Sequence, residues 1–234
     1  QVVGLTDVIA IDGGGDHSMA LKNDGTVWTW GFNSNGQLGI ENSFISLVPV
    51  QVSGLSNIIA ISGGYLFSLA LKSDGTVWAW GYNSGGQLGN NSTIDSAIPT
   101  QVSNLNGISS IHAGYYHSVA IKNDATAWAW GYNEDGQIGC GSNTSFTVPV
   151  QMVGINNVET AAAGNRHSLV ILKDGSLWAC GSNGFGQLGN NSNTSSNIPI
   201  QINEDFNHSK IACGFLFSLV LKADGTIWTW GDNL

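Results

Sequence analysis

Short apolar runs recur along this chain at a constant interval of fifty residues. In the first copy they predict four strands, at residues 8–11, 18–22, 27–31 and 49–52. Small or apolar residues occupy both sides of the second strand, which is typical of a strand buried between neighbouring sheets. A four-stranded antiparallel unit that is buried on both faces and repeated predicts a β-propeller, whose blades pack face to face.

Single residues that keep their place in the copies mark the period. They are Trp28, Trp78, Trp128, Trp178 and Trp228, then Gly31, Gly81, Gly131, Gly181 and Gly231, and then Gln37, Gln87, Gln137 and Gln187. A period near fifty is typical of a repeat architecture. We therefore expect one all-β propeller domain over residues 1–234, with five blades of about fifty residues, namely 1–50, 51–100, 101–150, 151–200 and the incomplete unit 201–234.

Turn and breaker residues refine this prediction. Asp24-Gly25 between two apolar runs predicts a type I′ hairpin. Ala125 replaces the glycine in the third copy, so we expect that turn to be strained by about 1 kcal/mol or to adopt another type. Pro49 predicts the start of the fourth strand, because proline lacks an N–H donor. In the fifth copy, His208 and Lys210 replace apolar residues and predict a shorter or more exposed first strand.

Composition excludes several classes of protein. The chain has 234 residues, of which 42% are apolar, so it can bury a core. Only 10% of residues are charged and the net charge is −9, which disfavours nucleic acid as a partner. No apolar run is long enough to span a membrane as a helix. Since the first residue is Gln1, we expect a mature, trimmed or excised form.

Cysteines and histidines carry no predicted chemistry. The three cysteines, Cys140, Cys180 and Cys213, fall at different repeat positions and predict small filler side chains. Three histidines each precede a serine, namely His17, His117 and His167. Phe67 and Phe217 take the same place in the other copies, and neighbours on a strand point to opposite faces. We therefore expect packing, and not proton transfer, at these positions.

Acidic residues also lack a predicted site. The turn aspartates belong to different blades, so they do not converge. Glu134 and Asp135 are adjacent in a loop, where a solvated surface is the main interpretation and weak calcium binding the alternative. No phosphate-binding loop follows a strand in a βαβ context. We predict no enzyme, no cofactor, and no catalytic or metal-binding residue.

The motif Gly-x-x-His-Ser-x-Ala-Leu-Lys-x-Asp-Gly, followed by Val-Trp-x-Trp-Gly-x-Asn-x-x-Gly-Gln-Leu-Gly, is most complete at residues 14–39 and 114–139. In these residues the chain resembles the regulator of chromosome condensation repeat family, over essentially its whole length. The resemblance implies a propeller, normally of seven blades. Either residues 1–3 complete the blade at 209–231 and close a five-blade wheel, or the chain is an open five-blade portion of a larger wheel, which the family favours. An open arc would expose apolar end faces and should self-associate.

The family's known activities find little support in these residues. The founding activity, guanine-nucleotide exchange on a small GTPase, uses an inserted wedge for which the uniform spacing leaves no room. A light-sensing branch of the family uses a Gly-Trp-Arg-His motif, whereas the same segments here read GGDH, GYLF, GYYH, GNRH and GFLF. A basic tail for chromatin is absent from the sequence, so a nuclear location is disfavoured. The acidic, lysine-poor composition rich in Asn, Ser and Gly favours an extracellular or cell-surface location over a cytoplasmic one.

Residues that differ between copies lie in the loops, where a rigid repeat can build specificity. In an up-and-down blade the first and third connections emerge on one face and the Asp-Gly turns on the other. We predict a partner-binding loop face composed of Asp16, Tyr65, Leu66, Tyr115, Tyr116, Glu134, Asp135, Asn165, Arg166, Phe185, Phe215 and Leu216. The predicted function is a non-enzymatic protein-interaction module. The alternative is a structural repeat of a surface or extracellular assembly that self-associates.

Overall fold

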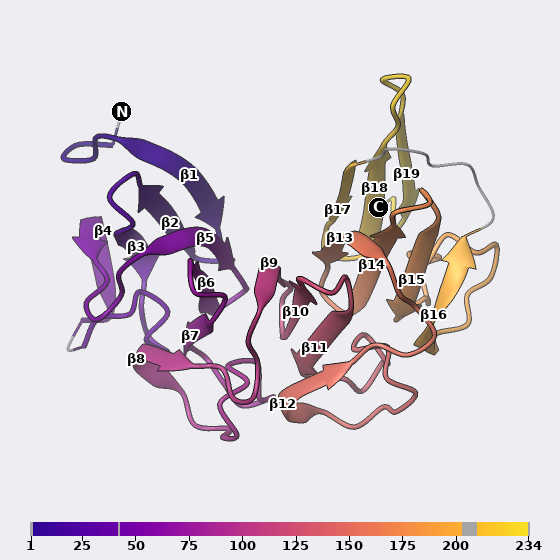
Figure 1. Cartoon of the computed structure of the whole chain (residues 1–234), viewed down its shortest axis with the longest axis horizontal. Helices are drawn as coiled ribbons and strands as arrows, with labels where there is room; N and C mark the ends of the chain where they lie inside the picture. The colour runs from indigo at the N-terminus through magenta and orange to yellow at the C-terminus, as the bar shows by residue number, and fades with distance from the viewer. Residues whose placement is uncertain (1, 42, 203–209, 234) are drawn as a thin grey trace.

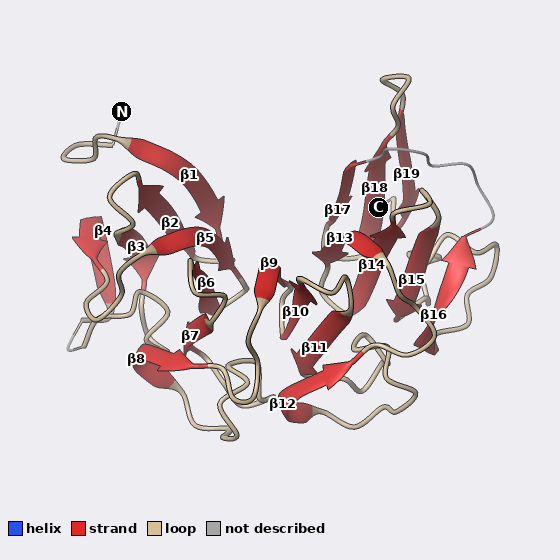
Figure 2. Cartoon of the chain, viewed as in Figure 1, coloured by secondary structure: helices blue, strands red, loops and turns tan. Residues whose placement is uncertain are grey.

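The computed structural model describes residues 2–41, 43–202 and 210–233. This part of the chain folds into strands, turns and loops and contains no helix (Figure 2). Accordingly, none of its elements is a helix that could cross a membrane. The strands form five separate antiparallel sheets, so the predicted all-β propeller of five blades is confirmed.

Each sheet is built from consecutive strands in chain order. The first contains β1 (Val8–Gly13), β2 (His17–Lys22), β3 (Val27–Phe32) and β4 (Ile45–Gln51). The second contains β5 (Ile58–Gly63), β6 (Phe67–Lys72), β7 (Val77–Gly81) and β8 (Ser96–Gln101). The third contains β9 (Ile108–Ala113), β10 (His117–Lys122), β11 (Ala127–Gly131) and β12 (Phe146–Gln151). The fourth contains β13 (Val158–Ala163), β14 (His167–Leu172), β15 (Leu177–Gly181) and β16 (Ser196–Ile202), and the fifth β17 (Lys210–Cys213), β18 (Phe217–Leu221) and β19 (Ile227–Gly231).

The five sheets follow one another around an arc that is open between β1 and the fifth sheet (Figure 1). First strands of neighbouring blades pack side by side, β5 against β1 and β9, and β13 against β9 and β17. Residues at the ends of all five first strands line one central depression of about 420 Å³. Residues 2 and 3 pair with no strand of the described chain, and β19 is an edge of its sheet. Of the two predicted arrangements, the described residues adopt the open arc.

Strand boundaries differ from the sequence prediction mainly at the outer edge of each blade. The fourth strand begins at Ile45 and not at Pro49, so the proline lies inside it. It is tolerated because β4 is an edge strand and the register shifts between Thr29 and Gly31 of its neighbour, next to the proline. In the fifth blade, β17 is described from Lys210, which is exposed, while His208 lies outside the described residues, so the expectation of a shorter or more exposed first strand stays a prediction.

The Asp-Gly hairpins are not the predicted type I′ turns. The Gly25 amide donates to the Lys22 carbonyl at 2.9 Å, and only Gly25 in this turn has a positive φ, of 77°. The turn is therefore a type I turn followed by a left-handed glycine, the usual three-residue hairpin loop. Ala125 takes the same conformation with a φ of 62°, so the third copy keeps the turn at the cost of backbone strain.

The contact between adjacent blades is a repeated set of buried hydrogen bonds. The main-chain carbonyl of Gln37, in the first blade, accepts from Ser68 Oγ and from Trp80 Nε1 of the second, both at 2.9 Å. The carbonyls of Gln87, Gln137 and Gln187 accept from the next blade's serine in the same way, and their second donors are Trp130, Cys180 and Trp230. We call each such carbonyl with its two donors an interblade clamp. The Gly-Gln-Leu-Gly segment therefore joins blades as well as shaping its own loop.

The first blade carries the two donors of a clamp, but no carbonyl of the described chain accepts from them. Ser18 Oγ and Trp30 Nε1 correspond to Ser68 and Trp80, yet neither makes a hydrogen bond within the described part of the chain. Both line an apolar pocket of about 690 Å³ on the open face, together with Ile11, which is 78% exposed. The fifth sheet likewise exposes apolar side chains on its outer side, such as Ile227.

Replacing one clamp tryptophan tests the importance of this contact. We expect Trp80→Phe to lower the free energy of unfolding by about 2 kcal/mol or more, because it removes a buried hydrogen bond and leaves a cavity. Trp30→Phe is the matched control, and it should cost less than about 1 kcal/mol, since that indole donates to nothing in the described chain. The free energy of unfolding of each variant is measured by urea denaturation, with circular dichroism as the signal. Equal losses for the two variants would contradict the clamp's role.

Candidate functional site

The first and third connections of each blade emerge on the same face because main-chain hydrogen bonds tie them together. The Tyr82 amide, just after β7, donates to the Leu66 carbonyl in the β5–β6 connection at 2.8 Å. The Tyr132 amide donates to the Tyr116 carbonyl at 2.9 Å in the third blade. The sequence-based placement of these two loop sets on one face is therefore correct for these blades.

All five tyrosines of the chain gather on this face in one continuous set of ring contacts. Tyr65 stacks on Tyr115 with ring centroids 4.7 Å apart and planes at 11°. Tyr115 also meets Phe215 of the fifth blade edge-on at 4.8 Å. We call this set the tyrosine surface, and it consists of Tyr65, Tyr82, Tyr115, Tyr116, Tyr132, Phe215 and the adjoining Arg166.

Tyr116 lies at the centre of the tyrosine surface. Its ring makes edge contacts with Tyr82 at 6.4 Å and Tyr132 at 6.2 Å, and also with Tyr65 and Tyr115. Beside it is a pocket of about 250 Å³, whose lining includes Gln87 and Arg166. The second, third and fourth blades therefore all contribute to one aromatic hollow.

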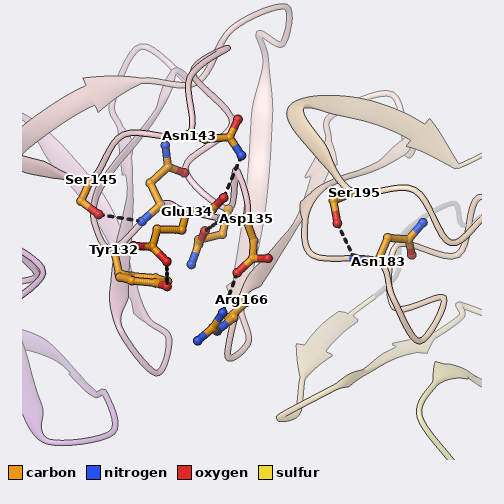
Figure 3. A network of polar contacts seen from close by, with 10 residues as sticks. Tyr132, Glu134, Asp135, Asn143, Ser145, Arg166, Asn183 and Ser195 are labelled. Atoms are coloured by element: carbon orange, nitrogen blue, oxygen red, sulfur yellow. Dashed lines mark hydrogen bonds and ion pairs between the residues drawn. The ribbon is translucent and has the colours of Figure 1, made fainter.

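Arg166 fixes one wall of this pocket. Its guanidinium lies over the Tyr132 ring, 5.2 Å from the centroid, and donates from Nη1 to Asp135 Oδ2 at 3.0 Å. Glu134, next to Asp135 in the same loop, accepts a hydrogen bond from the Tyr132 hydroxyl (Figure 3). Asn143 donates to the Glu134 carbonyl at 2.8 Å and holds the loop in place. The wall is thus a connected polar network and not a set of independent side chains.

Two tyrosines of this surface are held in the neutral form. Burial and neighbouring tyrosines raise the pKa of Tyr116 above its usual value. Burial and the hydrogen bond to Glu134 raise the pKa of Tyr132 to about 12. At neutral pH both phenols therefore keep their proton, and the Tyr116 hydroxyl has no hydrogen-bond partner in the described part of the chain.

The structure brings some of the predicted partner-binding residues together and leaves others apart. Tyr65, Tyr115, Tyr116, Arg166, Glu134, Asp135 and Phe215 belong to the tyrosine surface or its polar wall. Asn165 is only 5% exposed, and Leu66 and Leu216 are half-buried residues whose carbonyls accept main-chain hydrogen bonds. Asp16 is exposed without a ring contact, and Phe185 lies at a separate pocket beside Trp230.

Sequence reasoning missed three residues of this site, namely Tyr82, Tyr132 and Gln87. The two tyrosines follow the Trp-x-Trp-Gly motif directly, at a position that is aromatic in three of the five copies. That recurrence at a loop entrance was the available signal. Gln87 served only to mark the period, and nothing in its repeat position distinguishes it from the other glutamines.

The buried histidines pair with serines of the next blade and not with their own neighbours. His17 Nε2 lies 2.8 Å from Ser68 Oγ, whose own proton goes to the Gln37 carbonyl. The serine therefore accepts from the histidine N–H and cannot serve as a nucleophile activated by it. His117 and His167 make the same contact with Ser168 and Ser218. The expectation of a packing role is consistent with these contacts.

No metal-binding group was found among the residues the structure describes. In particular, no third His, Cys, Asp or Glu joins Glu134 and Asp135 in a cluster that could hold an ion. Both carboxylates instead have partners within the protein, the Tyr132 hydroxyl and the Arg166 guanidinium. The chemistry of this face is therefore that of aromatic rings and hydrogen-bond donors.

Comparison with known proteins agrees with this architecture. A family model described as the RCC1-like domain matches residues 1–234. The ultraviolet-B receptor UVR8 of Arabidopsis thaliana is 48% identical over 42 residues, which are 18% of this chain and 10% of that protein. Human WBSCR16 has a similar structure, with a TM-score of 0.88 and 24% identity over 98% of this chain. Prp20p from Saccharomyces cerevisiae has a TM-score of 0.84 and 20% identity over 100% of it.

These two solved structures are longer than the present chain. It covers 63% of the human chain and 58% of the yeast chain. At such identities the likeness shows the fold alone.

The buried histidines make stability depend on pH. Burial lowers the pKa of His17 and His167 to about 4 and that of His117 to about 3, against 6.5 when unfolded. As the pH falls, the unfolded chain binds these protons before the folded chain does. The free energy of unfolding therefore keeps its full contribution from these histidines above pH 6.5 and decreases as the pH drops toward 4. His112, whose pKa burial also lowers to about 4, adds to this window.

His117→Phe isolates one such proton, because phenylalanine occupies this position in the second and fifth blades. Between pH 6.5 and 4.5 we expect the free energy of unfolding of the variant to fall less steeply than that of the wild type. The two slopes should differ by at most about 1.4 kcal/mol per pH unit, the contribution of one proton. Urea unfolding at a series of pH values measures the slope. A slope equal to that of the wild type would contradict the lowered pKa, because His117 would then bind its proton equally in the folded and unfolded states.

Proposed function

Because the chain belongs to the RCC1-like domain family, we propose that it is a non-enzymatic module that binds a partner protein through the tyrosine surface. The observation that carries this proposal is the gathering of all five tyrosines on one loop face, from two successive blades, with Arg166 of the next blade beside them. Tyrosine and arginine are the residue types enriched at the centres of protein interfaces. The tyrosines are not required to hold the blades together, because the interblade clamps already join them.

A relative supports the class of partner. The structure of yeast Prp20p is described together with its binding properties to Gsp1p and histones, which are proteins. By analogy we expect a protein ligand here, although the present chain spans only 58% of that relative. The net charge of −9 favours a partner surface with positive charge over an acidic one.

Selection from a random peptide display library tests the location of the site. We expect most selected ligands to lose affinity about tenfold or more on Tyr115→Ala/Tyr116→Ala, because truncating central aromatic residues removes the principal contacts. Lys72→Ala, beside the Asp-Gly turn of the same blade as Tyr65, is the matched control and should leave affinity unchanged. Ligands that bind both variants as tightly as the wild type would refute the assignment of this face. Thermal unfolding of the variants shows whether the fold is intact.

A second candidate function is self-association into a structural assembly, and the open end faces favour it. One end exposes Ile11 at 78% and the unpaired clamp donor Trp30, and the other exposes Ile227 at 68% and Trp228 at 44%. Contiguous apolar faces of this kind are typical of surfaces that another protein covers. A second copy that set its fifth blade against the first blade would cover both, in a head-to-tail contact.

Sedimentation velocity over a range of concentrations tests this candidate. We expect species larger than the monomer at high concentration, and Ile11→Asp should shift the distribution toward the monomer by placing a charge in the contact. Tyr116→Ala on the loop face is the control and should leave the distribution unchanged. A monomer at every concentration would reject self-association and leave the loop-face proposal intact.

A further inference from the structure

The distances between the tyrosine rings beside Tyr116 match the repeat length of an extended peptide. The Tyr116 centroid lies 6.4 Å from that of Tyr82 and 6.2 Å from that of Tyr132, with interplanar angles of 65° and 62°. A chain in the polyproline II conformation rises about 3.1 Å per residue, so two residues advance about 6 Å. Successive pairs of residues in such a chain would therefore meet successive rings of this pocket.

The pocket presents hydrogen-bond donors without acceptors of their own. Gln87 Nε2 is buried and has no partner in the described chain, and Gln87 lines the pocket. The Tyr116 hydroxyl is also unpaired there. Arg166 has five N–H donors, and the structure records a hydrogen bond from one of its nitrogens, to Asp135. The same glutamine donor is unpaired in Gln37, Gln137 and Gln187, so the feature that distinguishes Gln87 is its place at the tyrosine pocket.

A ligand that matches these unpaired donors is rich in hydrogen-bond acceptors and poor in donors. Proline has no N–H, and a polyproline II chain makes no internal hydrogen bonds, so all its carbonyls are available. Peptides of this type bind aromatic-lined grooves in several unrelated domains. An extended strand adding to a sheet edge would need a row of backbone donors and acceptors, whereas the residues that line the pocket come from loops and strand ends of three blades.

Charge adds a further requirement on the ligand. Arg166 is paired with Asp135 at 3.0 Å, so their charges cancel locally. Glu134, exposed in the same loop, leaves one negative charge at the rim, and the whole chain carries a net charge of −9. A basic residue next to the prolines is therefore favoured over an acidic one.

From the rings, the unpaired donors and the rim charge, we propose that the Tyr82–Tyr116–Tyr132 pocket binds a proline-rich segment in the polyproline II conformation with a flanking basic residue. The inference rests on the proposed function and names the class of partner for the same surface. Prolines pack against the rings where they line the pocket, and peptide carbonyls accept from Tyr116, Gln87 and Arg166. The basic side chain lies toward Glu134.

Fluorescence anisotropy with labelled peptides tests the proposal on the whole chain. The probe is a peptide of Pro-Pro-Lys repeats, and the control peptide has Gly-Ser-Lys repeats of the same length and charge. We expect the proline peptide to bind about tenfold more tightly than the control, and a Pro-Pro-Glu peptide to bind more weakly than the Pro-Pro-Lys probe. Equal binding of the proline and control lysine peptides would overturn the proposal, because charge alone would then account for the affinity.

Variants place the peptide on the pocket. Tyr116→Ala should reduce affinity about tenfold or more, and Tyr116→Phe, which keeps the ring and removes the donor, about fivefold. The phenylalanine variant covers the case in which the alanine variant fails to fold, and Lys72→Ala should have no effect. Proline-peptide binding that is unchanged in Tyr116→Phe and Tyr116→Ala would overturn the assignment of the site.

The two proposals fail in different ways. If display selection yields ligands that depend on Tyr116 but contain no proline, and the Pro-Pro-Lys peptide does not bind, the loop face stands and the ligand class is wrong. If selected ligands bind independently of Tyr116, the loop face itself is wrong.

Discussion

A buried main-chain carbonyl that accepts two hydrogen bonds from the next blade is the contact on which the arrangement of this chain depends. The Gln37 carbonyl has no access to water once the second blade covers it, so losing its donors would cost about 1–3 kcal/mol. The same contact occurs at all four junctions between the described blades. At the third junction Cys180 replaces tryptophan and its thiol still reaches the carbonyl at 3.5 Å, which shows that the donor is retained when the ring is not.

These clamps leave the loop residues free to vary. Since blade packing depends on clamp residues that the copies share, apart from Cys180, the loop residues can differ without altering the frame. The tyrosine surface lies where such loops from neighbouring blades meet, and Tyr65 of the second blade stacks directly on Tyr115 of the third. The distance between blades, which the clamps set, therefore also sets the distance between rings.

Much of the fold could be predicted from the sequence, because a fifty-residue period and strand-length apolar runs leave few architectures open. Up-and-down connectivity correctly predicted that the first and third connections lie on one face, and Tyr65, Tyr115 and Tyr116 were placed on it, while partner binding by this face stays a prediction. Contacts between blades could not be predicted, since periodicity describes one blade and says nothing of which atoms of the next one it meets. For that reason the recurring glutamines, such as Gln37, served only to mark the period, and Tyr82 and Tyr132 were overlooked.

The most direct measurement of the central claim is the hydrogen-exchange rate of the tryptophan indole N–H groups, followed by nuclear magnetic resonance and assigned with Trp→Phe variants. If the clamps join the blades as described, Trp80 and Trp130, which donate to Gln37 and Gln87, exchange slowly. Trp30, which has the same repeat position and no acceptor in the described chain, exchanges much faster. Equal rates for Trp30 and Trp80 would contradict the account.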